Sequence, residues 1–227
     1  PRAVVTAFIA DAQPVLRGQI VAEVTGPGRA LLSGERVALN FLQRMSGIAT
    51  ATRRYVDAVK GTRAVILDTR KTVPGLRLLD KWAVRLGGGR NHRIGLYDMA
   101  LIKDNHIAAV GSITEAVRRV AAYDTQHRPI EVEVTNLEQL REALNLPIQR
   151  ILLDNMTPSR VRDSLDRLAC SGFRDRVRIE LSGGITDTTL AEYAALDIDV
   201  ISMGPLTHTV KNFSVTLEIL PGNEGSG

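Results

Sequence analysis

From residue 64 onward the sequence alternates short apolar segments with amphipathic segments, and this alternation restricts the fold more than any other feature. The apolar segments are rich in Val, Ile and Leu, which is typical of strands buried on both faces. We predict six such strands, at 64–68, 99–103, 130–134, 150–154, 177–181 and 199–203.

Helices are predicted between these strands. They are expected over 78–86, after the capping box Ser112-Ile113-Thr114-Glu115, from Asn136, from Thr157-Pro158 and after Thr186. This order predicts a parallel sheet covered by helices, an α/β fold. Because no G-x-G-x-x-G follows the first strand, a (β/α) barrel is favoured over a dinucleotide-binding sheet.

The first 62 residues have a different pattern. Two apolar stretches, 3–9 and 19–24, predict strands, and Ser33 is expected to cap a long helix that runs to about Gly61, with Ser46-Gly47 as a candidate break. Two strands and a helix make a poor domain, so we expect an N-terminal portion to lie outside the chain as given. The predicted organisation is an N-terminal α/β region at 1–62, a barrel at 63–210, and a C-terminal segment at 211–227 with a disordered end from Pro221.

Composition excludes several classes of protein. The net charge is +4, from 29 Lys+Arg and 25 Asp+Glu, and the basic residues are interleaved with acids, which argues against a nucleic-acid partner. No apolar run approaches the roughly 20 residues that span a membrane, and no signal peptide is recognisable. The single cysteine, Cys170, excludes an internal disulfide framework and a Cys-rich zinc site. We therefore expect a cytoplasmic protein.

Polar residues follow the predicted strands where a barrel would gather them at one mouth. The strands end in Asp68-Thr69-Arg70-Lys71, Lys103-Asp104-Asn105-His106, Glu133, Asp154-Asn155, Ser182-Gly183-Gly184 and Gly204, while His92 and Arg93 precede the second strand. The positive residues among them, Arg70, Lys71, His92, Arg93 and Lys103, exceed what a structural ion pair needs. They predict a site for several negative charges.

The remaining strand-end residues suggest more specific roles. Glu133 and Asp154 suit ribose hydroxyls or a divalent cation, with structural capping as the equal alternative. Ser182-Gly183-Gly184 and Met203-Gly204 have the form of paired phosphate loops, and a helix near Thr186 would add its positive end. We interpret Gly87-Gly88-Gly89 as a flexible loop that carries His92 and Arg93, and the pattern alone favours structural roles for His106 and His208.

Four motifs together resemble the quinolinate phosphoribosyltransferase family. They are residues 68–77, 87–93, 101–106 and 152–156, and the resemblance extends from Gly34 to His208. It implies an open (β/α) barrel preceded by a sandwich-like α/β domain, here truncated at its start. It also implies a homodimer, or a higher oligomer, in which a second subunit completes each active site.

The implied reaction joins quinolinate to phosphoribosyl pyrophosphate with Mg²⁺ and releases pyrophosphate and CO₂, giving nicotinate mononucleotide for NAD biosynthesis. Carried over by position, the quinolinate-binding residues are Arg70, His92, Arg93, Lys103 and the second subunit's counterpart of Arg36. The residues for phosphoribosyl pyrophosphate are Lys71, Lys103, Glu133, Asp154, Ser182, Gly183, Gly204 and His208. Of these, Lys71, Lys103, Glu133 and Asp154 are the implied catalytic residues, with Glu133 and Asp154 nearest the metal.

Two alternatives remain at this point. A related phosphoribosyltransferase that acts on another aromatic acid would keep the phosphate loops but change the arginines, whereas Arg36, Arg70 and Arg93 occur together here. A non-catalytic anion-binding barrel would leave the lysines and carboxylates unexplained. The sequence departs from the family pattern at Met203, Pro205 and Asn212, which leaves the detailed geometry of the last phosphate loop open.

Overall fold

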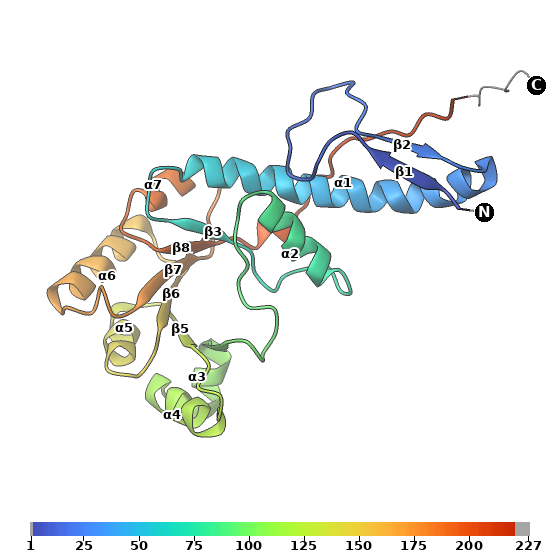
Figure 1. The fold of residues 1–227 in the computed structure, drawn as a ribbon. Coiled ribbons are helices and arrows are strands. Elements are labelled where there is room, and N and C mark those ends of the chain that lie inside the picture. Colours follow the sequence, from blue (N-terminus) through green and yellow to red (C-terminus); the bar gives the residue numbers. More distant parts are fainter. Residues whose placement is uncertain (1, 221–227) are drawn as a thin grey trace, which may run out of the picture.

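A six-stranded parallel sheet forms the centre of the molecule. The computed structural model describes residues 2–220. The strands are β3 (Val65–Leu67), β4 (Ala100–Ile102), β5 (Ile130–Val134), β6 (Arg150–Asp154), β7 (Arg178–Ser182) and β8 (Val200–Ser202). Their order is β3-β8-β7-β6-β5-β4, and every pairing is parallel (Figure 1).

The sheet curves into a barrel that stays open between its two end strands. Within the described residues β3 pairs with β8 and β4 with β5, and no ladder joins β3 to β4. Arg90 instead forms an isolated parallel bridge with Leu67 on the free edge of β3. The predicted open barrel is therefore confirmed.

Side-chain alternation divides each strand between the barrel interior and the helix layer. In β5, Val132 and Val134 are fully buried in the hydrophobic core, together with Ile151 of β6 and Ile179 of β7. The alternate positions face inward and include the charged residues Glu131, Arg150 and Glu180. This pattern puts charged side chains from neighbouring strands within reach of one another.

The helices between the strands largely follow their predicted signals. They are α2 (Arg77–Leu86), α3 (Asp104–Val110), α4 (Ile113–Tyr123), α5 (Leu137–Leu144), α6 (Pro158–Cys170), α7 (Leu190–Ala194) and α8 (Pro205–His208). Asn136 and Thr157 cap their helices as predicted. At Ser112 only half of the predicted capping box forms, because the Glu115 carboxylate pairs with Arg118 and Arg119.

The N-terminal region consists of the antiparallel strands β1 (Val4–Ala7) and β2 (Ala22–Thr25) and the helix α1 (Gly28–Ala58). The prediction that Ser33 caps α1 is wrong: the helix already begins at Gly28, and the Ser33 hydroxyl donates to the carbonyl of Arg29 at 2.7 Å. The helix also continues without a break through Ser46-Gly47.

Gly47 has a packing role in α1. A Cβ there would collide with the Lys211 carbonyl oxygen, so only glycine lets the C-terminal segment cross the helix so closely. The crossing is fixed by hydrogen bonds from Phe213 N to the Gln43 carbonyl (2.9 Å) and from Gln43 Nε2 to the Val215 carbonyl (2.8 Å). The segment thus runs beside α1 (Figure 1).

The predicted disordered end, Pro221 to Gly227, lies outside the described residues. Among the described residues, no helix is both long and apolar enough to cross a membrane.

Candidate active site

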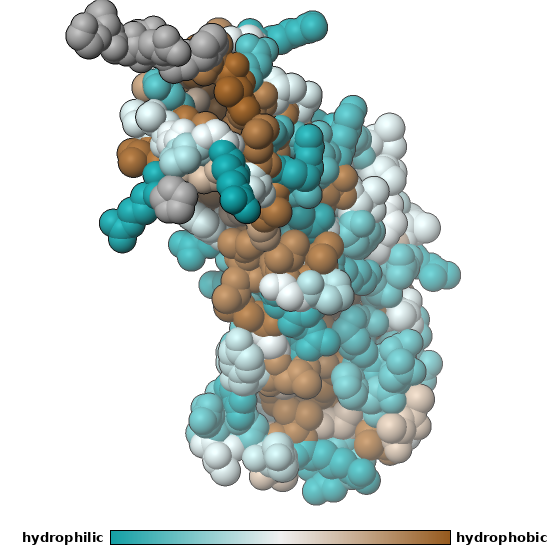
Figure 2. Space-filling model, turned by 90° about the vertical axis from the view of Figure 1, so that its right-hand side faces the viewer, coloured by the Kyte–Doolittle hydropathy of each residue, from teal (hydrophilic) through white to brown (hydrophobic). Residues whose placement is uncertain are grey.

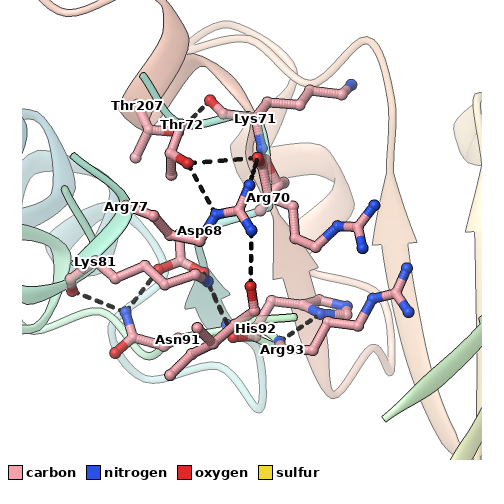
Figure 3. Close-up of polar contacts among 12 residues, drawn as sticks. Asp68, Arg70, Lys71, Thr72, Arg77, Lys81, Asn91, His92, Arg93 and Thr207 are labelled. Carbon is pink, nitrogen blue, oxygen red and sulfur yellow. Dashed lines mark hydrogen bonds and ion pairs between the residues drawn. The ribbon is translucent and has the colours of Figure 1, made fainter. Parts of the chain in front are cut away.

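Asp68, directly after β3, organises the loop that carries His92. Its carboxylate is fully buried and accepts hydrogen bonds from Lys81 Nζ at 2.5 Å, the His92 backbone N–H at 2.8 Å and Asn91 Nδ2 at 2.6 Å. Burial raises the pKa of Asp68, and these donors oppose that rise. Lys81 also donates to the His92 carbonyl at 3.0 Å, so α2 holds this loop at two points (Figure 3).

Arg77 of α2 connects the two loops at this edge of the mouth. Its guanidinium donates to Thr72 Oγ1 (3.1 Å), the Arg70 carbonyl (3.3 Å) and the Ile94 carbonyl (2.9 Å). The loop after β3 and the loop before β4 are therefore tied to one side chain.

Arg70, Lys71 and Arg93, which we call the cation set, have no ion pair with a carboxylate among residues 2–220. Figure 3 shows Arg70 and Arg93 pointing the same way. Burial lowers the pKa of Arg93, and the charge of Arg70 lowers it further. Two converging guanidinium groups without a carboxylate between them favour binding of an anionic ligand.

The triple glycine before His92 is tightly packed, so the prediction of a flexible loop is wrong. A Cβ at Gly87 would lie 2.6 Å from Thr52 Cβ of α1, and a Cβ at Gly89 would lie 2.8 Å from Thr52 Cγ2. Glycine is required because the loop passes directly against α1. The helix therefore supports His92 and Arg93 from behind.

His92 lies between two buried carboxylates inside the barrel. Its Nε2 is 3.2 Å from Glu131 Oε2 and 3.3 Å from Glu180 Oε1. Arg150 lies beside the same acids, with Nη1 2.9 Å from Glu180 Oε2 and Nε 4.0 Å from Glu131 Oε1. We call His92, Glu131, Arg150 and Glu180 the support cluster.

The members of the support cluster have shifted pKa values, and the shifts differ in direction. Burial by itself would raise the pKa of Glu180, but the hydrogen bond and charge of His92 lower it. Burial by itself would lower the pKa of His92, but hydrogen bonds and charge from Glu131 and Glu180 raise it to about 9. Burial, followed by the charge of Glu180, raises the pKa of Glu131 to about 7. The Arg93 backbone N–H donates to His92 Nδ1 at 2.8 Å. In this arrangement Nδ1 is an acceptor and the ring N–H is on Nε2, facing the carboxylates.

Lys103 and Glu133 form an ion pair at the ends of β4 and β5, with Nζ 3.1 Å from Oε2. Asp154 ends the next strand, and its carboxylate accepts from Asn155 Nδ2 at 2.7 Å. His106 accepts from the Lys103 backbone N–H at 3.0 Å, which agrees with the structural role favoured for it.

Glu133 and Asp154 offer carboxylate oxygens, the ligands that Mg²⁺ prefers, and Mg²⁺ commonly needs only one or two of them beside water and substrate phosphates. The donor set therefore fits this ion.

The predicted phosphate loops lie at the ends of β7 and β8. Gly183 and Gly184 have positive φ angles, 88° and 64°, and a Cβ at Gly183 would collide with the Asn155 side chain. A Cβ at Gly204 would lie 2.8 Å from His208 Nε2 and 3.2 Å from Lys71 Cδ. The fold thus brings Gly204, His208 and Lys71 together.

One helix at the phosphate loops differs from the prediction. The helix predicted after Thr186 is present but begins only at Leu190 (α7), where the Leu190 N–H donates to the Thr186 carbonyl at 2.9 Å, so it does not start beside the glycine loop. The helix that begins next to a glycine loop is α8, which opens at Pro205 directly after Gly204. Met203 is buried beneath it.

Arg36 is not brought together with the other predicted residues in the single chain. Its side chain is 71% exposed, and its ion pair is with the adjacent Glu35 at 3.9 Å. It lies in the third turn of α1, on the half that projects away from the sheet (Figure 1), and not in the first turn, where a helix capped by Ser33 would place it.

Comparisons with known proteins give one consistent result. The profile of the "Quinolinate phosphoribosyl transferase, C-terminal domain" matches residues 48–218, and that of the N-terminal domain matches residues 1–46. The chain belongs to the quinolinate phosphoribosyl transferase family.

Several members of the family are closely similar over most of the chain. The "Probable nicotinate-nucleotide pyrophosphorylase [carboxylating]" of Bacillus subtilis (strain 168) is 45% identical over 214 residues, which are 94% of this chain and 72% of the relative. The "Nicotinate-nucleotide pyrophosphorylase [carboxylating]" of Mycobacterium leprae (strain TN) is 46% identical over 211 residues, which are 93% of this chain and 73% of the relative.

The crystal structure of NadC from Streptococcus pyogenes superposes with a TM-score of 0.85 at 42% identity, covering 93% of this chain and 74% of that one. The nicotinate-nucleotide pyrophosphorylase of Ehrlichia chaffeensis gives 0.87 at 37% identity, covering 92% and 74%.

Sequence reasoning missed several residues that build the site of this family member. The missed residues are Arg77, Lys81, Glu131, Arg150 and Glu180, and no position-specific role was given to Asp68. The two-residue period of strands was a usable signal, since Glu131 shares a strand face with Glu133, and Glu180 shares one with Ser182. No such periodicity in the sequence indicates that Lys81 pairs with Asp68.

Proposed function

We propose that this protein transfers the phosphoribosyl group of phosphoribosyl pyrophosphate to quinolinate and releases pyrophosphate and CO₂. The product is nicotinate mononucleotide, a precursor of NAD. The observation that carries the proposal is the cation set: Arg70 and Arg93 converge without a carboxylate partner in the described residues. It occurs in a family whose members named above are nicotinate-nucleotide pyrophosphorylases.

Charge supports this choice of substrates. Quinolinate carries two carboxylates and phosphoribosyl pyrophosphate carries several phosphate charges, so the two can share a site only where cations offset their repulsion. In the proposal Arg70, Arg93 and His92 serve the quinolinate side. Lys71, the glycines of the two phosphate loops and His208 serve the phosphates.

The chemistry needs mainly positioning and charge compensation. As the bond from the anomeric carbon to pyrophosphate breaks, the ribose gains positive character, which the carboxylates of Glu133 and Asp154 can stabilise. The quinolinate nitrogen then bonds to that carbon. When the 2-carboxylate leaves as CO₂, its electron pair stays on ring carbon C2, where the positively charged nitrogen stabilises it, and a proton from water then binds to C2.

Mg²⁺, held beside Glu133 and Asp154 in this proposal, would supply charge neutralisation for the pyrophosphate. Besides contacting the substrates in this proposal, Lys103 fixes the Glu133 carboxylate at the mouth of the barrel through their ion pair at 3.1 Å. A cytoplasmic site of action remains a prediction.

We also propose a homodimer in which each subunit lends Arg36 to the other. Exposed hydrophobic side chains are concentrated on the N-terminal elements: Val4, Val5, Phe8, Leu16, Ile20, Leu32, Val37, Phe41 and Leu42. Figure 2 shows hydrophobic residues gathered in a band over this side of the molecule. Such a surface is typical of an interface, and a second copy there would bury α1 around Arg36.

Turnover of quinolinate and phosphoribosyl pyrophosphate with Mg²⁺, followed as CO₂ release, tests the activity. Nicotinate, which lacks the 2-carboxylate, should react at least about 30-fold more slowly, since an unpaired buried guanidinium costs about 2–5 kcal/mol. Equal turnover of nicotinate would point to a transferase for another aromatic acid, and no turnover of either would point to an anion-binding barrel.

The shared site is tested by mixing two inactive chains, Arg36→Ala and Lys103→Ala. Each mixed dimer would contain one intact site, and random pairing makes half of the dimers mixed. Activity should therefore recover to about one quarter of the wild-type value. If mass spectrometry shows subunit exchange but activity stays at the level of the single variants, the shared site is wrong.

A further inference from the structure

The support cluster contains buried charge that the proposed chemistry does not use. Glu131 and Glu180 are both fully buried, and three of their carboxylate oxygens, Glu131 Oε1 and Oε2 and Glu180 Oε1, have no hydrogen-bond partner of good geometry. Burying carboxylates whose oxygens are only partly hydrogen-bonded is costly. A fold that keeps two of them needs a reason in their surroundings.

Both carboxylates are directed at one atom. Glu131 Oε2 and Glu180 Oε1 approach the same His92 Nε2, at 3.2 and 3.3 Å, from strands β5 and β7. Arg150 of the intervening strand β6 holds Glu180 at 2.9 Å. Three adjacent strands thus hold the imidazole from below.

The opposite edge of the ring is also fixed, and it leads to the cation set. His92 Nδ1 accepts the Arg93 backbone N–H at 2.8 Å, and Arg93 Nη1 donates to the Met99 carbonyl at 3.0 Å. The position of the ring therefore fixes the backbone of Arg93 and the direction in which its side chain extends. A shift of His92 would move Arg93 with it.

The charge of the cluster also assists the cation set. The Glu131 carboxylate lies near Arg93, and its charge favours the protonated form of Arg93. This partly offsets the repulsion between Arg70 and Arg93 before any ligand arrives. The free protein can therefore keep both guanidinium groups in the binding arrangement.

We propose that Glu131, Glu180 and Arg150 are positioning residues that act through His92 to set the affinity of the cation set for the dicarboxylate substrate. The inference rests on the proposed function. His92, Glu131 and Glu180 also form the group of potential metal ligands found in the described residues. However, Arg150 already pairs with Glu180 there, and Arg93 lies close by, so both guanidinium groups would repel a metal ion.

The test compares Glu131→Gln and Glu180→Gln, which keep the side-chain shape and remove the charge. Each should raise KM for quinolinate about tenfold, while kcat and KM for phosphoribosyl pyrophosphate stay within about threefold of wild type. Asp199→Asn is the matched control, because it removes another acid that is paired with arginines in the barrel, far from the mouth. It should leave KM for quinolinate unchanged.

A double-mutant cycle separates positioning from general damage. In a His92→Asn background, Glu131→Gln should raise KM for quinolinate less than about twofold, because the group it acts through is gone. Equal fold-changes in both backgrounds, or an equal rise in KM for phosphoribosyl pyrophosphate, would overturn the proposal. If Glu131→Gln does not fold, Glu180→Gln carries the same cycle.

Elemental analysis of the dialysed wild-type protein tests the metal alternative: a tightly bound ion that Glu131→Gln loses would also overturn the proposal. Absence of wild-type turnover would instead contradict the proposed function, so the two failures are distinguishable.

Discussion

The cation set and the support cluster lie next to each other in the barrel but are built in opposite ways. Arg70, Lys71 and Arg93 have like charges and no carboxylate partners among the described residues, whereas His92 and Arg150 are surrounded by Glu131 and Glu180. Unpaired charge of one sign identifies where a ligand must complete the site. Paired and buried charge identifies what holds that site in shape.

The largest effect is expected from removing the unpaired charges. The double variant Arg70→Ala/Arg93→Ala should lower kcat/KM for quinolinate by about 10³-fold or more, because each guanidinium faces a substrate carboxylate. Arg178→Ala is the control, since this exposed arginine begins β7 at the opposite end of the barrel. The activity is measured as CO₂ release. If kcat/KM of the double variant falls less than about tenfold, the cation set does not bind the substrate and the distinction from the support cluster is wrong.

A second comparison concerns acids at the mouth and acids in the support cluster. Glu133→Ala and Asp154→Ala should each lower kcat about 100-fold, because they act on the positive charge that develops in the transition state. Their Kd for quinolinate, measured by calorimetry, should change less than about threefold. These variants should therefore lower kcat with little change in quinolinate binding, whereas Glu131→Gln should raise KM for quinolinate with little change in kcat. Weaker quinolinate binding with unchanged kcat would return Glu133 and Asp154 to structural roles.

The support cluster should also make the free energy of unfolding depend on pH. The folded-state pKa of His92, about 9, lies above the unfolded value of about 6.5. Its stabilisation is therefore fully present below pH 6.5 and is lost as pH rises through 9. Between pH 6 and 10, wild type should lose about 1–3 kcal/mol more unfolding free energy than His92→Asn in urea titrations. Parallel losses in the two proteins would show that His92 carries no such proton.

The smallest effect is expected from a backbone change in the phosphate loop after β7. Gly183→Ala should raise KM for phosphoribosyl pyrophosphate about five- to tenfold, because φ is +88° and the new Cβ would displace Asn155. Gly172→Ala is the matched control: φ is also positive, +71°, but the site is open. It should lower the melting temperature without changing KM. A similar change in KM for both variants would show that the phosphate loop is not specifically sensitive.

The elements that the sequence predicted best are those with local signals. The strands, the caps at Asn136 and Thr157, and the strand-end positions of Arg70 and Glu133 depend on residues close in the chain. The errors arose where distant segments decide. Ser33 looked like a cap, but the helix already begins after Pro27, and the triple glycine looked flexible because its contact with Thr52 of α1 cannot be read from its own neighbours.

The sequence by itself therefore determined the parallel (β/α) architecture and the positive mouth, because periodicity and strand ends are local properties. Only the tertiary structure decided how the charges pair. Arg150 meets Glu180 because β6 lies beside β7, and Lys81 meets Asp68 because α2 packs against α1, which also contacts β3. Strand order, register and helix packing determine which side chains meet inside the barrel, and burial there decides whether a charge remains free for a ligand or must be neutralised by its neighbours.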